Sequence, residues 1–229
     1  MAKISKLIDE LKGKTEEEIR TREQYCFLQK MASAKSETFE NRLKLKLSKE
    51  ETAGAPEIVG GRAYEYHSGQ HVNISQQCDD AVPKEIAEFF KGSEEVKAGF
   101  QKLVKKGLSG PINDTSIGET EETKSFVFPE NYAIVRVDVT AYKYAFSSED
   151  VLANNVENVF VYTMAKSIVD CKKVSLDSLL HAVVDILNDD TGENLNIEQV
   201  MPFVKELQMY WKLLDENAIS ASASDLLRG

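Results

Sequence analysis

The sequence has few cysteines and no long apolar run. Cys26, Cys78 and Cys171 are the only cysteines among 229 residues, and they lack the paired spacing of a disulfide framework. No stretch approaches the ~18 consecutive apolar residues of a transmembrane helix. The segment Met1–Leu11 carries charges where a secretory signal would be apolar. We therefore expect a soluble protein with free cysteines, kept in the cytoplasm or exported by a route that uses no N-terminal signal.

Positive charge is also in short supply. The chain has 28 Lys and Arg against 38 Asp and Glu, for a formal net charge of -10. Binding to nucleic acid depends on a basic surface that displaces counterions from phosphates. The acidic composition therefore argues against a nucleic-acid partner, and it leaves a protein partner, a second copy of the chain or membrane lipid.

Catalytic signatures are missing as well. The sequence contains no glycine-rich phosphate loop, no G-x-S-x-G elbow, no H-E-x-x-H pair and no kinase motif. We expect no cofactor and favour a protein that is not an enzyme. A small enzyme whose scattered residues are brought together only by folding stays open.

The composition suits one folded domain. Hydrophobic residues make up 42% of the chain and charged residues 29%, values close to those of ordinary globular proteins. We expect a single α+β domain over residues 1–229, with flexible connections near 49–62 and 109–124 and a polar tail at 219–229. Its sheet is expected to be antiparallel or mixed, with one long central strand, a cover of amphipathic helices and a C-terminal helical group.

Apolar spacing of three and four residues predicts the helices. One begins near Pro83, pauses at Gly92 and Ser93 and ends at Gly107. Ser175 is expected to cap another helix that ends at Leu187. The remaining predicted helices span residues 4–11, 15–31, 152–170 and 200–214; for 152–170 the β-branched run Val159–Thr163 leaves a strand as the alternative.

Alternating patterns predict the strands. Residues 39–47 alternate leucine with lysine or arginine and read as a half-buried strand. Residues 63–75 read as a hairpin that turns near Ser68 and Gly69. Residues 132–146 read as an unusually long strand, with small apolar side chains on one face.

The other face of the 132–146 strand is the candidate binding surface. It carries Tyr132, Tyr142, Tyr144 and Phe146, with charges such as Arg136 between them. Aromatic residues and arginine are enriched in protein interfaces. The alternative is a second buried sheet face beneath helices.

Cys171 is the candidate for a modified or partner-linked thiol, because it follows a predicted helix end and is the cysteine most expected to be exposed. An ordinary free thiol is the alternative. A thiol nucleophile would need a histidine base nearby. The sequence alone does not distinguish among His67, His71 and His181 for that role. The C-terminal end of a helix does not lower the pKa of a thiol, whereas the N-terminal end does. The position of Cys171 therefore argues against an activated nucleophile.

Two parts of the sequence contain residue types that can bind a metal ion. Residues 188–200 resemble the calcium loop of an EF-hand, but Glu193 stands where that family needs glycine and Gln199 where it needs glutamate. His67, His71 and Cys78 fall short of a zinc ligand set. We expect no metal at either place.

The order of the predicted elements resembles that of the cytolytic toxins of the Cyt type, which combine helical layers with long strands. No sequence motif is shared, so no residue roles follow. The resemblance implies a membrane-active protein whose amphipathic helices leave the sheet to meet lipid. That is the alternative to our first expectation, a non-enzymatic interaction or self-assembling protein.

Overall fold

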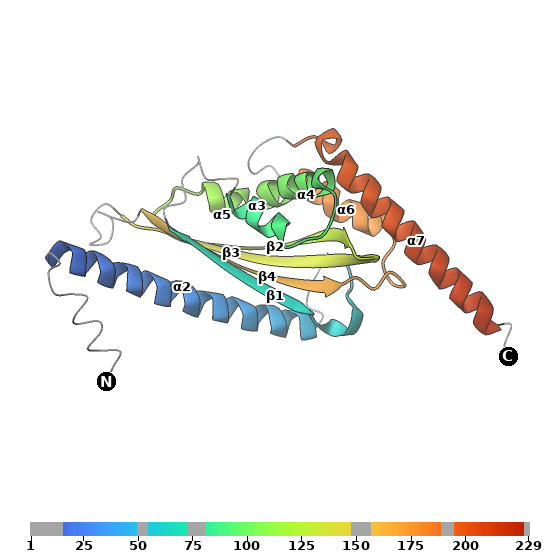
Figure 1. Ribbon diagram of the computed structural model, residues 1–229, viewed down its shortest axis with the longest axis horizontal. Coiled ribbons are helices and arrows are strands. Elements are labelled where there is room, and N and C mark those ends of the chain that lie inside the picture. Colours follow the sequence, from blue (N-terminus) through green and yellow to red (C-terminus); the bar gives the residue numbers. More distant parts are fainter. Residues whose placement is uncertain (1–15, 50–54, 73–80, 148–156, 189–194, 227–229) are drawn as a thin grey trace.

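The protein is an α+β structure built on one antiparallel sheet (Figure 1). The computed structural model describes residues 16–49, 55–72, 81–147, 157–188 and 195–226. Within these ranges, no helix is both long enough and apolar enough to cross a membrane. The predicted fold class is confirmed.

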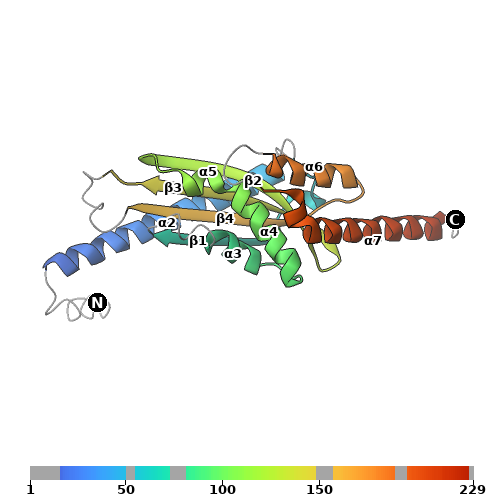
Figure 2. The ribbon, with the colours of Figure 1, turned by 90° about the horizontal axis from the view of Figure 1, so that it is seen from above.

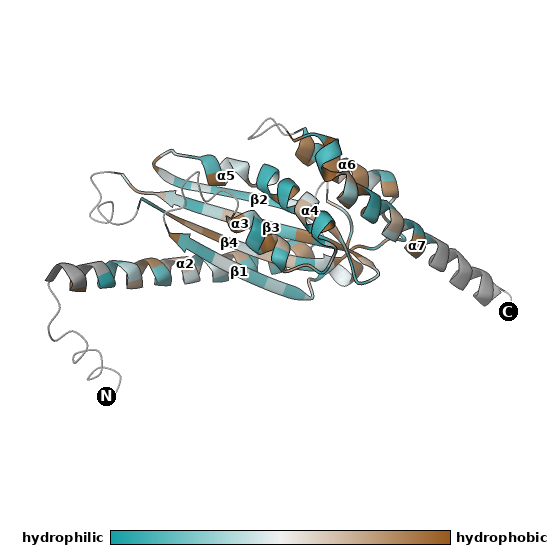
Figure 3. Cartoon of the chain, turned by 45° about the horizontal axis from the view of Figure 1, so that its top comes forward, coloured by the Kyte–Doolittle hydropathy of each residue, from teal (hydrophilic) through white to brown (hydrophobic). Residues whose placement is uncertain are grey.

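Four strands form the sheet in the order β1-β4-β3-β2, each antiparallel to its neighbours. Their bounds are β1 Glu65–Val72, β2 Gly118–Glu130, β3 Ala133–Ala145 and β4 Asn158–Ile168. The long strand predicted at 132–146 is β3, and it lies inside the sheet with β2 and β4 on its two sides. In Figure 3 the edge strand β1 is coloured mostly hydrophilic, in contrast to β4 beside it.

The large apolar core lies between one face of the sheet and a group of helices. These are α3 Ala81–Glu88, α4 Glu94–Gly107, α5 Ser109–Asn113, α6 Leu176–Leu187 and the first turns of α7 Met201–Leu226. Phe100, Phe128 and Phe203 meet at its centre, with ring centroids 4.9 to 6.1 Å apart. Packed aromatic groups of this kind contribute through both buried area and ring geometry.

A single long helix, α2 Glu16–Ser48, covers the opposite face (Figures 1 and 2). Its apolar contact with the sheet consists of two small clusters. Phe39 and Leu28 pack with Tyr142 in one cluster, and Leu43 and Leu47 pack on Ala165 in the other. The two faces of the sheet are therefore covered very unequally.

The capped helices agree with their predictions. Ser93 N-caps α4 by accepting a hydrogen bond from the Val96 amide at 3.3 Å, which explains the pause at Gly92 and Ser93. Ser175 caps α6 in the same way, accepting from the Ser178 amide at 3.1 Å.

The strand predicted at 39–47 is wrong, because these residues belong to α2, which therefore extends well beyond the predicted 15–31 helix. Leu43 and Leu47 are four residues apart and share the buried side of the helix, whereas Leu45 is exposed. The intervening lysines and leucines are good helix formers. The alternation arose from an exposed leucine between two buried ones.

The 152–170 helix is also wrong, and the strand alternative is correct, because residues 158–168 form β4. Residues 158–167 are all buried, so neither strand face shows a polar alternation. The hairpin predicted at 63–75 is wrong as well. Ser68 and Gly69, the predicted turn, lie inside the single strand β1. Residues 73–75 lie outside the described ranges.

The flexible connection predicted at 109–124 contains regular structure. Residues 109–113 form α5, and residues 118–124 form the first half of β2. Part of the predicted polar tail is helical, since α7 continues to Leu226. Of the predicted 49–62 connection, residues 59–61 form the short helix η1 Val59–Gly61, and 50–54 lie outside the described ranges. The predicted helix at 4–11 lies outside them too.

Candidate interaction site

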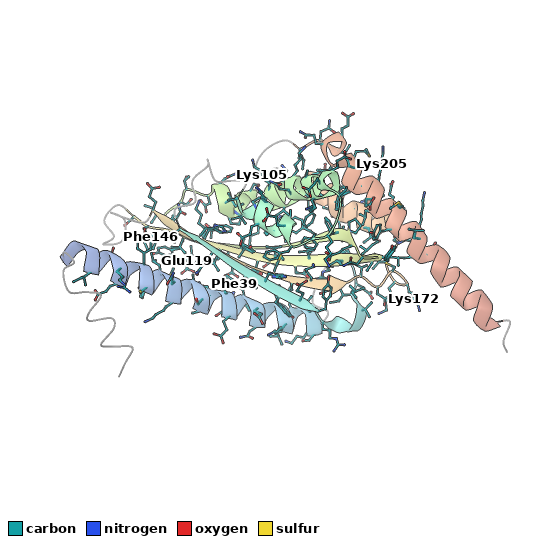
Figure 4. All side chains as sticks on the ribbon, in the orientation of Figure 1. Phe39, Lys105, Glu119, Phe146, Lys172 and Lys205 are labelled. Carbon is teal, nitrogen blue, oxygen red and sulfur yellow. The ribbon has the colours of Figure 1, made fainter. Side chains whose placement is uncertain are left out.

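Four of the five predicted binding residues lie on the sheet face that α2 covers. Tyr142 is buried, with its ring centroid 6.1 Å from that of Phe39 and 4.1 Å from Lys35 Nζ. Tyr144 and Phe146 are partly buried against the same cluster and contact each other edge to face at 4.8 Å. In Figure 4, Phe146 and Glu119 lie at one end of the sheet above α2.

Arg136, the charged residue of the predicted set, is engaged inside the protein. Its guanidinium donates to Asp138 Oδ1 at 2.8 and 3.1 Å and to the Pro56 carbonyl at 2.9 Å. Ser125 Oγ donates to the same carboxylate oxygen. Because Arg136 and Asp138 are only 1% and 2% exposed, this ion pair holds the face under α2 together and is not presented to a partner.

Tyr132 lies apart from the other four residues. It follows Asn131 in the tight turn between β2 and β3, where both residues have positive φ, 50° and 61°. Its side chain is 84% exposed, and its ring stacks on that of Tyr210 in α7 at a centroid distance of 6.5 Å. The favoured turns of two-residue hairpins need positive φ at both central residues, so the turn accounts for both angles.

Beside this turn lies an apolar hollow, which we call the Cys171 groove. Its volume is about 220 Å³. Its walls come from η1, from the start of β3, from the end of β4 with the turn that follows, and from α7. The lining residues are Val59, Ala133, Ile134, Ile168, Val169, Asp170, Cys171, Lys172, Leu214 and Asp215.

Backbone hydrogen bonds fix the walls of the groove. The Val169 amide donates to the Ile134 carbonyl, and the Asp170 amide donates to the Glu57 carbonyl, each at 2.9 Å. Helix α7 is tied to the turn after β4 by Trp211, whose Nε1 donates to the Val174 carbonyl at 3.4 Å. The groove is therefore a feature of ordered backbone.

The Cys171 thiol is partly buried in this wall. Burial raises its pKa, and the neighbouring Asp170 carboxylate adds to the rise. Its Sγ lies 3.8 Å from the Val169 carbonyl oxygen. Because the thiolate is the nucleophile, this environment suppresses thiol reactivity.

Large apolar side chains are exposed in the walls of the groove. Val59 and Ile168 line it and are 52% and 44% exposed. Asp170, Lys172 and Asp215 supply charges of both signs around it. Figure 4 shows Lys172 at this end of the sheet, beside α7 and opposite the end that carries Phe146.

The predicted histidine pair lies elsewhere, on β1. His67 and His71 are on one face of a single strand, and not on two arms of a turn as the hairpin implied. His67 Nε2 lies 2.8 Å from Glu65, and His71 Nε2 lies 2.8 Å from Glu85 of α3. Cys78 falls outside the described ranges. Across those ranges, no group of three or more His, Cys, Asp or Glu residues is placed to hold a metal ion.

Residues 189–194 of the EF-hand-like segment are also outside the described ranges. Its last residues form the short helix η3 Ile197–Val200. Asn196 and Gln199 make a reciprocal capping box there, with the Asn196 amide donating to Gln199 Oε1 at 2.8 Å. Gln199 therefore acts as a helix-capping residue.

The sequence identified two parts of the groove region, Tyr132 and Cys171, without indicating that they lie at the same end of the fold. Ile168 was missed as a groove residue, because the 152–170 segment was predicted as a helix, whereas Ile168 ends the strand β4. Val59 carried no signal, because an isolated valine between glycines and polar residues has no periodicity.

The fold and this groove define an α+β protein with an apolar site at one end of its sheet. No protein-family model, curated protein or solved structure matches the chain.

Proposed function

We propose that this is a non-enzymatic interaction protein whose Cys171 groove binds an apolar segment of a partner protein. The observation that supports this proposal is the apolar hollow with exposed Val59 and Ile168 in its walls and exposed Tyr132 in the adjacent turn. Exposed apolar patches rimmed by polar residues are typical of binding sites.

The size of the groove favours a protein side chain over a cofactor. Pockets for drug-sized ligands usually hold about 300 to 1,000 Å³, more than the groove's volume of about 220 Å³. Room of this order suits one or two large apolar side chains. Protein interfaces commonly combine such a buried centre with a polar rim, a role that Asp170, Lys172 and Asp215 can fill here.

The partner is best described as an amphipathic segment with leucine or aromatic anchors. Val59 and Ile168 are exposed apolar residues in the walls of the groove, where an amphipathic segment can place its apolar anchors. Tyr132 would contribute a large rigid contact at the edge of the groove. Tyrosine is among the residues enriched at positions that carry most of the binding energy of an interface.

The test is differential capture with immobilised protein, followed by binding measurements on the purified partner. A Tyr132→Ala, Ile168→Ala double variant removes two exposed apolar contacts at the groove. Leu45→Ala is the control, because Leu45 is also an exposed apolar residue, at 55%, but lies on α2. We expect one protein to bind the wild type and Leu45→Ala with equal affinity, and the double variant roughly tenfold or more weakly. Equal binding to all three, or no specific binding to any, would contradict the proposal.

A membrane-active role is the second candidate, supported by the unequal layers. Helices lie on both faces of a sheet with 13-residue strands, the arrangement that the resemblance to Cyt-type toxins implies. The apolar contact of α2 with the sheet is limited to two small clusters, and its ion pairs to β2 are exposed, so it is the layer that could leave the sheet. Dye leakage from liposomes tests this role: Phe39→Ala should speed leakage by loosening α2, and an absence of leakage across lipid charge and pH would remove it.

An enzyme is the third candidate and has less support. The groove is mainly apolar, and its nucleophile candidate, Cys171, has a pKa raised by burial. Enzymes activate a cysteine in the opposite direction, by lowering its pKa.

A further inference from the structure

The strand β2 forms one edge of the sheet and is 13 residues long. Within the part of the chain that the structure describes, no strand pairs with its outer side. In its first half, side chains alternate between half-buried and exposed, whereas residues 126–130 are buried. An edge of this length is a template for a further strand unless charge or proline blocks it.

Charge does not block this edge, because its carboxylates are neutralised within the chain. Each lies within ion-pair distance of a cation: the pairs are Glu119–Lys35 at 3.3 Å, Glu121–Arg42 at 2.8 Å and Glu122–Lys124 at 3.0 Å. The exposed half of β2 is therefore close to neutral, although the chain carries a formal net charge of -10. A second acidic copy would meet little repulsion here.

Symmetry restricts how two β2 strands can pair. Two identical antiparallel edge strands are related by a two-fold axis through the sheet, so a residue at the axis faces its own copy. With Thr123 at the axis, Glu122 of each copy lies opposite Lys124 of the other. This register forms two opposite-charge pairs and one Thr–Thr pair, both favourable across strands.

The neighbouring registers are unfavourable. An axis at Glu119, Glu121, Glu122 or Lys124 places that charge against its own copy. An axis at Thr120 sets Glu119 opposite Glu121. Directly opposed like charges destabilise a strand pair, so within residues 119–124 Thr123 is the charge-matched centre.

Proline does not block this register either. Pro129 is near the end of β2, and pairing of residues 119–127 around Thr123 leaves it outside the ladder. The pairing would extend the four-stranded sheet to eight strands across the two-fold axis.

We propose that β2 binds a second copy of this chain, edge to edge and antiparallel about Thr123. The surface uses β2 and shares no residue with the Cys171 groove, so the two proposals can fail separately.

The test is the mass of the full-length protein in solution, measured by size-exclusion chromatography with light scattering over a wide range of concentration. Glu122→Lys places lysine opposite Lys124 twice, and Lys124→Glu places glutamate opposite Glu122 twice. We expect either single variant to raise the dimer dissociation constant roughly tenfold or more. The double variant Glu122→Lys, Lys124→Glu should restore it, because the charges are exchanged but still complementary.

Glu119→Lys is the matched control. It makes the same change in charge on the same strand, but residue 119 faces Val127 of the other copy in this register. It should leave the dissociation constant nearly unchanged. Circular dichroism melts of each variant at low concentration separate loss of pairing from loss of folding.

Three outcomes would overturn the proposal. They are a monomeric wild type at every concentration, a dimer that tolerates both single variants, and a double variant that dissociates like the singles. The Tyr132→Ala, Ile168→Ala variant should dimerise like the wild type, and its failure to do so would assign self-association to the groove.

Discussion

Gly69 of β1 lies directly against the ring of Tyr162 on β4. A Cβ on Gly69 would come within 2.3 Å of Tyr162 Cε1 and within 2.6 Å of Cζ. The two residues are opposite each other in the β1–β4 ladder, and Tyr162 is fully buried. A glycine in a strand often marks such a close approach.

Gly69→Ala should therefore destabilise the protein by about 1 to 3 kcal/mol, since the methyl group must displace a packed ring. Thermal melting would show this as a fall in Tm of several degrees. In a Tyr162→Leu background the same substitution should cost much less. Gln70→Ala, at the exposed neighbouring position, should have little effect, and an equal loss there would point to a general weakness of β1.

The buried Arg136–Asp138 pair gives a second prediction. Removing one partner leaves an uncompensated charge beneath α2, which costs about 3 to 5 kcal/mol. Arg136→Met should lower the denaturant midpoint accordingly. The double variant Arg136→Met, Asp138→Leu should recover much of the stability, whereas a double variant no better than the single would contradict this account of the pair.

Cys171 should react more slowly with thiol reagents than Cys26. Cys26 is exposed, while Cys171 is partly buried with a raised pKa. Because only the thiolate reacts, a raised pKa also shifts the onset of Cys171 labelling to higher pH. Time-resolved labelling with N-ethylmaleimide and mass spectrometry of a Cys78→Ser variant would measure both rates. Faster labelling of Cys171 at neutral pH would show that the thiol is activated.

The lowered pKa of Glu65 predicts that the folded protein loses stability in acid. Burial alone would raise the pKa of this carboxyl, but hydrogen bonds from Lys166 and His67 outweigh burial and lower it. A lowered folded-state pKa contributes stability that is present above the unfolded value, near 4.3, and is lost as the pH falls through the folded value.

Glu65→Gln should therefore be less stable than the wild type at neutral pH, by no more than about 1 kcal/mol because the side chain is partly exposed. The difference should shrink below pH ~4. Melting temperatures of both proteins across the acid range test this, and a gap that stays constant with pH would rule out the Glu65 charge as its source.

Sequence patterns predicted the elements whose apolar residues repeat at one period. The helices α4 and α6 do so, and β3 does so although it is buried on both faces, because polar residues such as Arg136 and Asp138 alternate with its valines. Patterns failed where the apolar residues do not follow one period. In β4, residues 158–167 are buried on both faces, and in α2 the exposed Leu45 imitates strand alternation. Gly69 was read as a turn because a contact with a residue distant in sequence leaves no local signal.

The Cys171 groove could be predicted only in fragments. Its walls include residues as far apart in the sequence as Val59, Ile134 and Leu214. No local period relates these positions. They meet because β4 lies between β1 and β3 and because Trp211 ties α7 to the turn after β4.

The strand order also has a consequence for how the chain acquires its structure. Among the strands that the structure describes, β1 pairs only with β4, so Glu65 gains its cross-strand neighbour Lys166 only when the chain about a hundred residues later has been made. Such distant pairing slows folding, whereas the adjacent β2–β3 hairpin closes over a two-residue turn. During synthesis, a nascent chain that stops after β3 would hold that hairpin, but β1 would have no neighbour. Helix α2, although made first, would also lack Val159, Val161 and Ala165 to pack against.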